Sequence, residues 1–101
     1  MARVSRNNDL AATGHTCTAV IGVIATCRTV YANGIRVARP PDRLKPHTIY
    51  CGCPPCCCNH PAVINRGSRT VFAEGIPVAR VGDSADMGRM IQGSGNVYAG
   101  G

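Results

Sequence analysis

The sequence predicts a small all-β protein, and three observations support this fold class. Twelve glycines and seven prolines are spread over 101 residues, and both residue types interrupt helices. The stretch Cys17–Cys27 is rich in β-branched side chains, which favour strands. Apolar residues do not recur with a helical period over three turns. With no tryptophan and one phenylalanine the core is thin, so we expect a disulfide, a metal ion or a partner to add stability.

A twelve-residue repeat predicts the architecture. Residues 28–39 (RTVYANGIRVAR) and 69–80 (RTVFAEGIPVAR) are identical at nine of twelve positions, and residues 96–101 (NVYAGG) resemble the first half of the same unit. In each full copy a Thr-Val-aromatic run precedes a glycine-containing turn, after which the alternation resumes, and this pattern predicts a β-hairpin. Because a lone hairpin is marginally stable, we expect three units around one axis in a single domain, residues 1–101.

Between the two full copies lies a segment of different character, residues 40–61, which is rich in proline and cysteine. Its composition predicts a folded loop tied by disulfides or a metal. Short spacings also link aspartates to candidate ligands: Asp9 precedes His15, Asp42 precedes His47 and Asp83 precedes Met87. We interpret these aspartates, together with Asp86, as turn residues whose side chains bond the local backbone.

The cysteines and histidines lie in the same parts of the chain. They are Cys17, Cys27, Cys51, Cys53, Cys56, Cys57, Cys58, His15, His47 and His60. Each histidine is close in sequence to a cysteine, and thiolate sulfur with imidazole nitrogen is a donor set that Zn²⁺ prefers and iron accepts. We therefore expect one structural metal site. Disulfides among the remaining cysteines are an open alternative, since seven is odd and leaves at least one unpaired.

Charge and motif content argue against other classes of protein. The net charge is +6, from eleven basic and five acidic residues, but the basic residues form no run, so we expect no nucleic-acid partner. The sequence has no Gly-rich phosphate loop and no G-x-S-x-G motif, so we expect no enzyme. Residues 1–12 lack the apolar segment of a signal peptide, and the longest apolar run, Ala19–Ala25, is far shorter than the roughly 20 residues that span a bilayer.

Several segments resemble the PAAR-repeat family of spike-tip proteins. Residues 75–83 (GIPVARVGD) carry Pro-Val-Ala-Arg where the family's name-giving motif is Pro-Ala-Ala-Arg, and residues 14–17, 67–72 and 93–97 extend the resemblance over nearly the whole chain. The resemblance implies a cone-shaped, pseudo-threefold fold of short β-hairpins with a metal site near the vertex. It also implies that the base of the cone sits on the homotrimeric β-helical spike of a phage tail or a type VI secretion system.

The same resemblance implies three histidines and one cysteine as metal ligands. His15, His47 and His60 fall at positions resembling the family's histidine ligands, whereas Met87 stands where the family often has its cysteine. Because a thioether is a poor zinc ligand, we expect Cys58 as the fourth ligand: in an extended segment Cys58 and His60 face the same side. Cys17 beside His15 competes for the same reason. The other candidates are Cys51, Cys53, Cys56, Cys57 and Met87.

These expectations combine into a non-enzymatic structural role. The protein would cap and sharpen the spike of a contractile injection machine, one monomer on one trimer, and would contact the target cell membrane transiently. We expect it to be made in the bacterial cytoplasm without a signal peptide and to act at a virion tail tip or in an injected spike complex. One alternative is a small Cys/His metal-binding module that contacts nucleic acid through its arginines. Another is a redox or metal-storage protein.

Overall fold

Short β-strands joined by turns make up the described part of the chain, which confirms the all-β prediction. The computed structural model describes residues 1–52 and 56–101. Its strands are β1 (Ala2–Arg3), β2 (Leu10–Ala12), β3 (Val20–Gly22), β4 (Tyr31–Ala32), β5 (Ile35–Arg36), β6 (His47–Tyr50), β7 (Cys57–His60), β8 (Phe72–Ala73), β9 (Ile76–Pro77), β10 (Ser84–Ala85), β11 (Gly88–Met90) and β12 (Tyr98–Ala99). Within the described ranges there is no helix long and apolar enough to cross a membrane.

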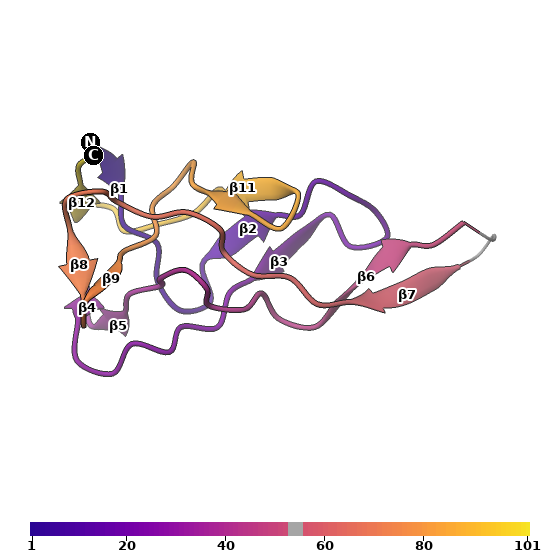
Figure 1. Ribbon diagram of the computed structural model, residues 1–101, viewed down its shortest axis with the longest axis horizontal. Coiled ribbons are helices and arrows are strands. Elements are labelled where there is room, and N and C mark those ends of the chain that lie inside the picture. The colour runs from indigo at the N-terminus through magenta and orange to yellow at the C-terminus, as the bar shows by residue number, and fades with distance from the viewer. Residues whose placement is uncertain (53–55) are drawn as a thin grey trace.

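The molecule is elongated, and its two ends are built differently. It measures 43 × 23 × 21 Å. Figure 1 shows both chain termini at one end, the base, together with β1, β4, β5, β8, β9 and β12. The β6–β7 hairpin projects at the opposite end, the tip. Between them lies the body, a four-stranded sheet in the order β10-β11-β2-β3 with the chain segments that cover it.

The repeated segments form the base. In the first copy Tyr31 pairs with Arg36 across the β4–β5 hairpin, and in the second Phe72 pairs with Pro77 across β8–β9. The turns contain Asn33-Gly34 and Glu74-Gly75, all four with positive φ, which explains why glycine is retained at the second turn position of both copies. The third unit is completed by the other end of the chain, because β12 pairs with β1.

A ring of backbone hydrogen bonds relates the three units to one another. The amide of Ser5 donates to the carbonyl of Ala79 at 2.9 Å, that of Ala79 to Ala38 at 2.8 Å, and that of Ala38 to Ser5 at 2.9 Å. These three residues precede Arg6, Arg39 and Arg80 in the equivalent units. This closed cycle of three hydrogen bonds has the pseudo-threefold symmetry that the repeat predicts.

Three aspartates serve as turn residues, as predicted from the sequence. In each of the motifs Arg6-x-x-Asp9, Arg39-x-x-Asp42 and Arg80-x-x-Asp83, a carboxylate oxygen accepts from the backbone amide of the arginine, at 2.8, 2.9 and 2.8 Å. The backbone amide of each aspartate donates in return to the carbonyl of its arginine. Each unit therefore enters the body through the same local turn.

Two clusters of buried side chains fill the body and the base. The body cluster is Ala11, Val23, Ala38, Leu44, Ile64, Ala79, Ala85 and Met90. The base cluster is Val4, Cys27, Ala32, Val37, Ala73, Val78 and Ala99. Most of these side chains are small, so the core is thin, as the composition predicts. Beyond His47 the residues of β6 and β7 are half-buried or exposed, so the core ends where the tip begins.

Candidate metal centre

Four side chains from separate segments converge at the junction of the body and the tip. Nε2 of His15 and Nε2 of His47 lie 2.8 and 2.9 Å from Oδ2 of Asp86, and Nε2 of His60 lies 3.0 Å from its Oδ1. One donor atom from each of the four residues lies within 4.8 Å of the other three. The side chains of His47 and Asp86 are 1% and 2% exposed, and that of His60 is the most open at 25%.

Strand pairing positions two of the histidines. His47 is the first residue of β6, His60 is the last residue of β7, and the two stand opposite each other in the antiparallel register. Directly opposed residues place their side chains on the same face of a sheet. The register of the hairpin therefore brings together two imidazoles that are thirteen positions apart in the chain.

The other two side chains come from turns. His15 follows β2 in the loop that leads to β3. Asp86 lies in the tight turn between β10 and β11, where Ala85 pairs with Gly88, and has φ of 53°. Gly14 has φ of 81°, and a Cβ there would lie 2.6 Å from the carbonyl carbon of Met87. A glycine before His15 thus lets the His15 loop pass directly against the Asp86 turn.

The hydrogen-bond chemistry of the group favours a cation at its centre. Nδ1 of His47 lies 2.8 Å from the carbonyl oxygen of Lys45, and Nδ1 of His15 lies 3.2 Å from that of Thr16. Both nitrogens of each of these rings therefore face an oxygen, either a carbonyl or the Asp86 carboxylate. A neutral imidazole carries one N–H, which can donate to only one of these two oxygens. The other ring nitrogen would then point its lone pair at an oxygen that is also an acceptor. Two extra protons or one metal ion would resolve this.

Asp86 is held in its ionised form. Burial acts to raise the pKa of the carboxyl, but hydrogen bonds from His60, His15 and His47 outweigh it, and the pKa of Asp86 lies below its ordinary value. A carboxylate that stays charged in a nearly buried position requires positive charge close by. The group thus combines one fixed negative charge with three imidazole nitrogens.

The donor set and its dimensions fit a tetrahedral metal ion. Ligand bonds of about 2.0–2.2 Å place the four donors of a tetrahedral zinc site roughly 3.4 Å apart. The donor atoms here span up to 4.8 Å without an ion, which small side-chain movements would adjust. The carbonyls of Lys45 and Thr16 at the Nδ1 atoms provide the outer partners that fix the orientation of metal-binding histidines.

The structure brings together the three predicted histidines but not the predicted cysteine. Sγ of Cys58 is bonded to Cys51, so Cys58 does not offer a thiolate, and Asp86 is the fourth member of the group. Cys17 is bonded to Cys57, and Cys56 is disulfide-bonded as well. Cys27 has a free thiol, but it is buried in the base cluster. Cys53 lies outside the described residues.

Met87 and Asp86 correct the sequence-based assignment of the last turn. Met87 is 63% exposed and does not belong to the group, although the resemblance implied a ligand at its position. Asp86 was assigned only a turn role, and it has that role as well as facing the three histidines. The sequence held one indication that Asp86 could belong to the site: it directly precedes Met87, the position at which the resemblance implied a ligand.

The fold and the site define a class: an all-β, pseudo-threefold repeat protein whose narrow end is built around a His₃Asp group. Comparison with known protein families adds a family assignment. The PAAR motif family matches residues 13–88 and again residues 57–101. The chain belongs to this family. No curated protein matches the chain.

Proposed function

We propose that this protein is the structural tip of the spike of a contractile injection machine, in a phage tail or a related secretion system. Membership of the PAAR motif family supports the proposal. The observation that carries it is the symmetry of the base. A monomer with three equivalent sides, closed by the Ser5–Ala38–Ala79 ring, matches the end of a homotrimer, where each subunit meets one side.

The base presents one exposed aromatic side chain from each of its three units. Tyr31, Phe72 and Tyr98 occupy equivalent positions in β4, β8 and β12, and are 54%, 54% and 49% exposed. Exposed aromatic rings in a symmetric set are unusual on a surface that only meets water, and aromatic residues are enriched among the anchors of protein interfaces. We infer that these rings pack against the end of a trimeric β-helical spike, one monomer on three chains.

Binding to the spike trimer is the experiment that tests this role. A purified homotrimeric β-helical spike should bind one copy of this chain per trimer, measured by calorimetry with mass determination of the complex. Phe72→Ala combined with Tyr31→Ala should weaken binding at least tenfold, because hot-spot truncations cost about 2 kcal/mol or more. Tyr50→Ala is the matched control, since Tyr50 is an aromatic residue with 52% exposure at the tip, and it should bind normally. Three copies per trimer would contradict the proposal.

We further propose that His15, His47, His60 and Asp86 hold one structural metal ion, with Zn²⁺ favoured and iron as the alternative. The ion would cross-link segments at a level where the core has ended, which allows the narrow tip to stay rigid on contact with a target membrane. Elemental analysis should find one ion per chain in the parent and a reduced content in Asp86→Ala. Chelation should lower the melting temperature of the parent. No bound metal, or several equivalents per chain, would contradict the assignment.

A further inference from the structure

His15 lies in the loop of residues 13–19 between β2 and β3, which contains none of the named strands. Thr16, Cys17 and Ala19 are exposed, and His15 and Thr18 are half-buried. His47 and His60 by contrast stand in paired strands, and Asp86 lies in a two-strand turn. The buried hydroxyl of Thr13 anchors the backbone of His15 on one side, and contacts of residues 16–18 with the tip hold the loop on the other.

Hydrogen bonds attach one side of this loop to β6. The amide of Tyr50 donates to the carbonyl of Thr16, and the amide of Thr18 donates to the carbonyl of Thr48 at 3.1 Å. The hydroxyl groups of Thr18 and Thr48 lie 3.2 Å apart. Cys17 forms an isolated bridge with Ile49. All of these contacts are to β6, and all lie at a partly or fully solvent-exposed surface.

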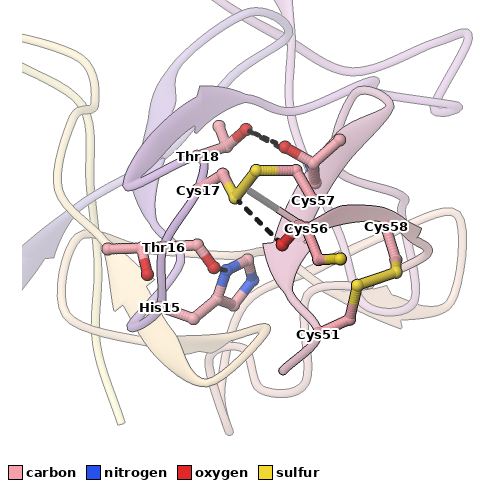
Figure 2. Close-up of a disulfide and its surroundings, with 9 residues drawn as sticks. His15, Thr16, Cys17, Thr18, Cys51, Cys56, Cys57 and Cys58 are labelled. Atoms are coloured by element: carbon pink, nitrogen blue, oxygen red, sulfur yellow. Dashed lines mark hydrogen bonds between the residues drawn. A yellow bond between two sulfur atoms is a disulfide. The ribbon is translucent and has the colours of Figure 1, made fainter. Parts of the chain in front are cut away.

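A disulfide attaches the same loop to β7. Sγ of Cys17 is bonded to Sγ of Cys57, which is paired with Tyr50 in the hairpin register. Figure 2 shows this bond beside His15, with Cys51–Cys58 as a separate disulfide. Cys17 is two residues from His15, and Cys57 is three residues from His60. The bond thus joins the loop of one histidine to the strand of another.

We propose that the Cys17–Cys57 disulfide is a positioning element of the metal centre: it holds the His15 loop against β7, so that metal affinity depends on the redox state of this one pair. The inference rests on the metal site proposed above. Cys51–Cys58 has a different role, because both of its cysteines belong to the hairpin arms and neither belongs to the His15 loop. These two disulfides therefore differ in what they join: Cys17–Cys57 joins the His15 loop to β7, and Cys51–Cys58 joins the two sides of the hairpin to each other.

Redox dependence follows from the chemistry of the bond. Closing the pair removes two protons and two electrons from the Cys17 and Cys57 thiols, and a disulfide oxidant such as oxidised glutathione accepts them and leaves as two thiols. Thiols stay reduced in the cytosol and pair in oxidising compartments. The chain would thus hold its metal ion more weakly where it is made than outside the cell, where the tip acts.

The test compares metal binding in two double variants of the full chain. Zn²⁺ affinity is measured against a chromophoric chelator for the oxidised parent, for Cys17→Ser with Cys57→Ser, and for Cys51→Ser with Cys58→Ser. The first variant should bind Zn²⁺ at least tenfold more weakly than the parent, as is typical when the partners of metal ligands are removed. The second should stay within about threefold. Serine adds no thiolate, so a new sulfur ligand cannot compensate.

A second readout separates positioning of the ligand from general destabilisation. The visible spectrum of bound Co²⁺ reports the ligand set, and it should change in the Cys17/Cys57 variant alone. Amide exchange at Ser5, Ala38 and Ala79 checks that the body stays folded, and Cys17→Val with Cys57→Val replaces the serine variant if it does not. Equal affinities in the parent and the Cys17/Cys57 variant, or equal losses in both variants, would overturn the inference. A parent that binds no metal would instead overturn the proposed metal site.

Discussion

The base and the tip of this protein are stabilised in different ways. The base and body are built three times over from equivalent pieces, and each piece buries small apolar side chains in a shared core. The tip, formed by β6 and β7, occurs once, and these strands bury no apolar side chain as completely as the core does. It is stabilised instead by strand pairing, by disulfides that include Cys17–Cys57 and Cys51–Cys58, and by the group around Asp86.

The difference follows from geometry. Three units around an axis can bury a core only where the cross-section is wide enough for side chains to meet. Towards the tip two units end, and a single hairpin continues (Figure 1). A two-stranded hairpin alone is at best marginally stable in water. Covalent and metal cross-links act on a few atoms and need no buried area, so they suit a part of the molecule too narrow for a core.

The largest expected effect is on the body. Ile64 is fully buried in the body cluster, and its amide donates to the carbonyl of Asp42. Ile64→Ala should lower the free energy of unfolding by about 2–5 kcal/mol, because it removes buried methylenes and leaves a cavity. Denaturant unfolding of the oxidised protein measures this. Ile91→Ala, at a side chain that is 40% exposed, is the control and should cost much less. Equal effects of the two substitutions would mean that the body has no specific core.

The disulfides should differ in their effect on global stability. Cys17 and Cys57 are 40 residues apart and enclose β3, β4, β5 and β6, whereas Cys51 and Cys58 are 7 apart within the hairpin. In the chain-entropy description, a closed loop of the first length stabilises by about 4 kcal/mol and one of the second by about 2 kcal/mol. Unfolding of the corresponding double serine variants, followed in metal-free protein, should show this order. The reverse order would indicate that the tip and body unfold independently.

Much of the base and body could be predicted from the sequence. A repeated segment indicates a repeated structural unit even when no contacts between residues are known. The copies at 28–39 and 69–80 predicted their hairpins, and the half copy at 96–101 suggested a third unit. The sequence did not indicate that β1 completes that unit, because residues 2–3 carry no copy of the repeat. Strand partners across a whole chain depend on tertiary closure and leave little local signal.

The tip was less predictable, because its chemistry depends on pairing. The three histidines were identified from their neighbourhood, but Cys58 was preferred as the fourth ligand on local alternation alone. Its bond to Cys51 crosses the hairpin, and the position of Asp86 depends on a turn from another part of the chain. Disulfide connectivity is not determined by spacing when several cysteines are close in sequence. The choice between a thiolate and a carboxylate therefore required the fold.

The smallest expected effect tests whether the three units are energetically equivalent. In Asp9→Ala and in Asp83→Ala, an arginine loses the carboxylate that accepts from its backbone amide and from its Nε. Each change should cost about 1–3 kcal/mol, because a partly buried donor is left without its partner, and the two costs should agree closely. Asp42→Ala should cost a comparable amount, because Asp42 accepts from the backbone amide of Arg39 and, in place of a guanidinium, from the amide and the hydroxyl of Thr26.

Thermal unfolding of the three variants at one pH measures these differences. If the symmetry extends to the energetics, Asp9→Ala and Asp83→Ala lower the melting temperature by the same amount, and metal content stays at the parent's value in both. A large difference between them would show that the unit containing the chain ends is weaker than the continuous one. In that case the closure of β1 on β12, rather than the turn, would limit the stability of the base.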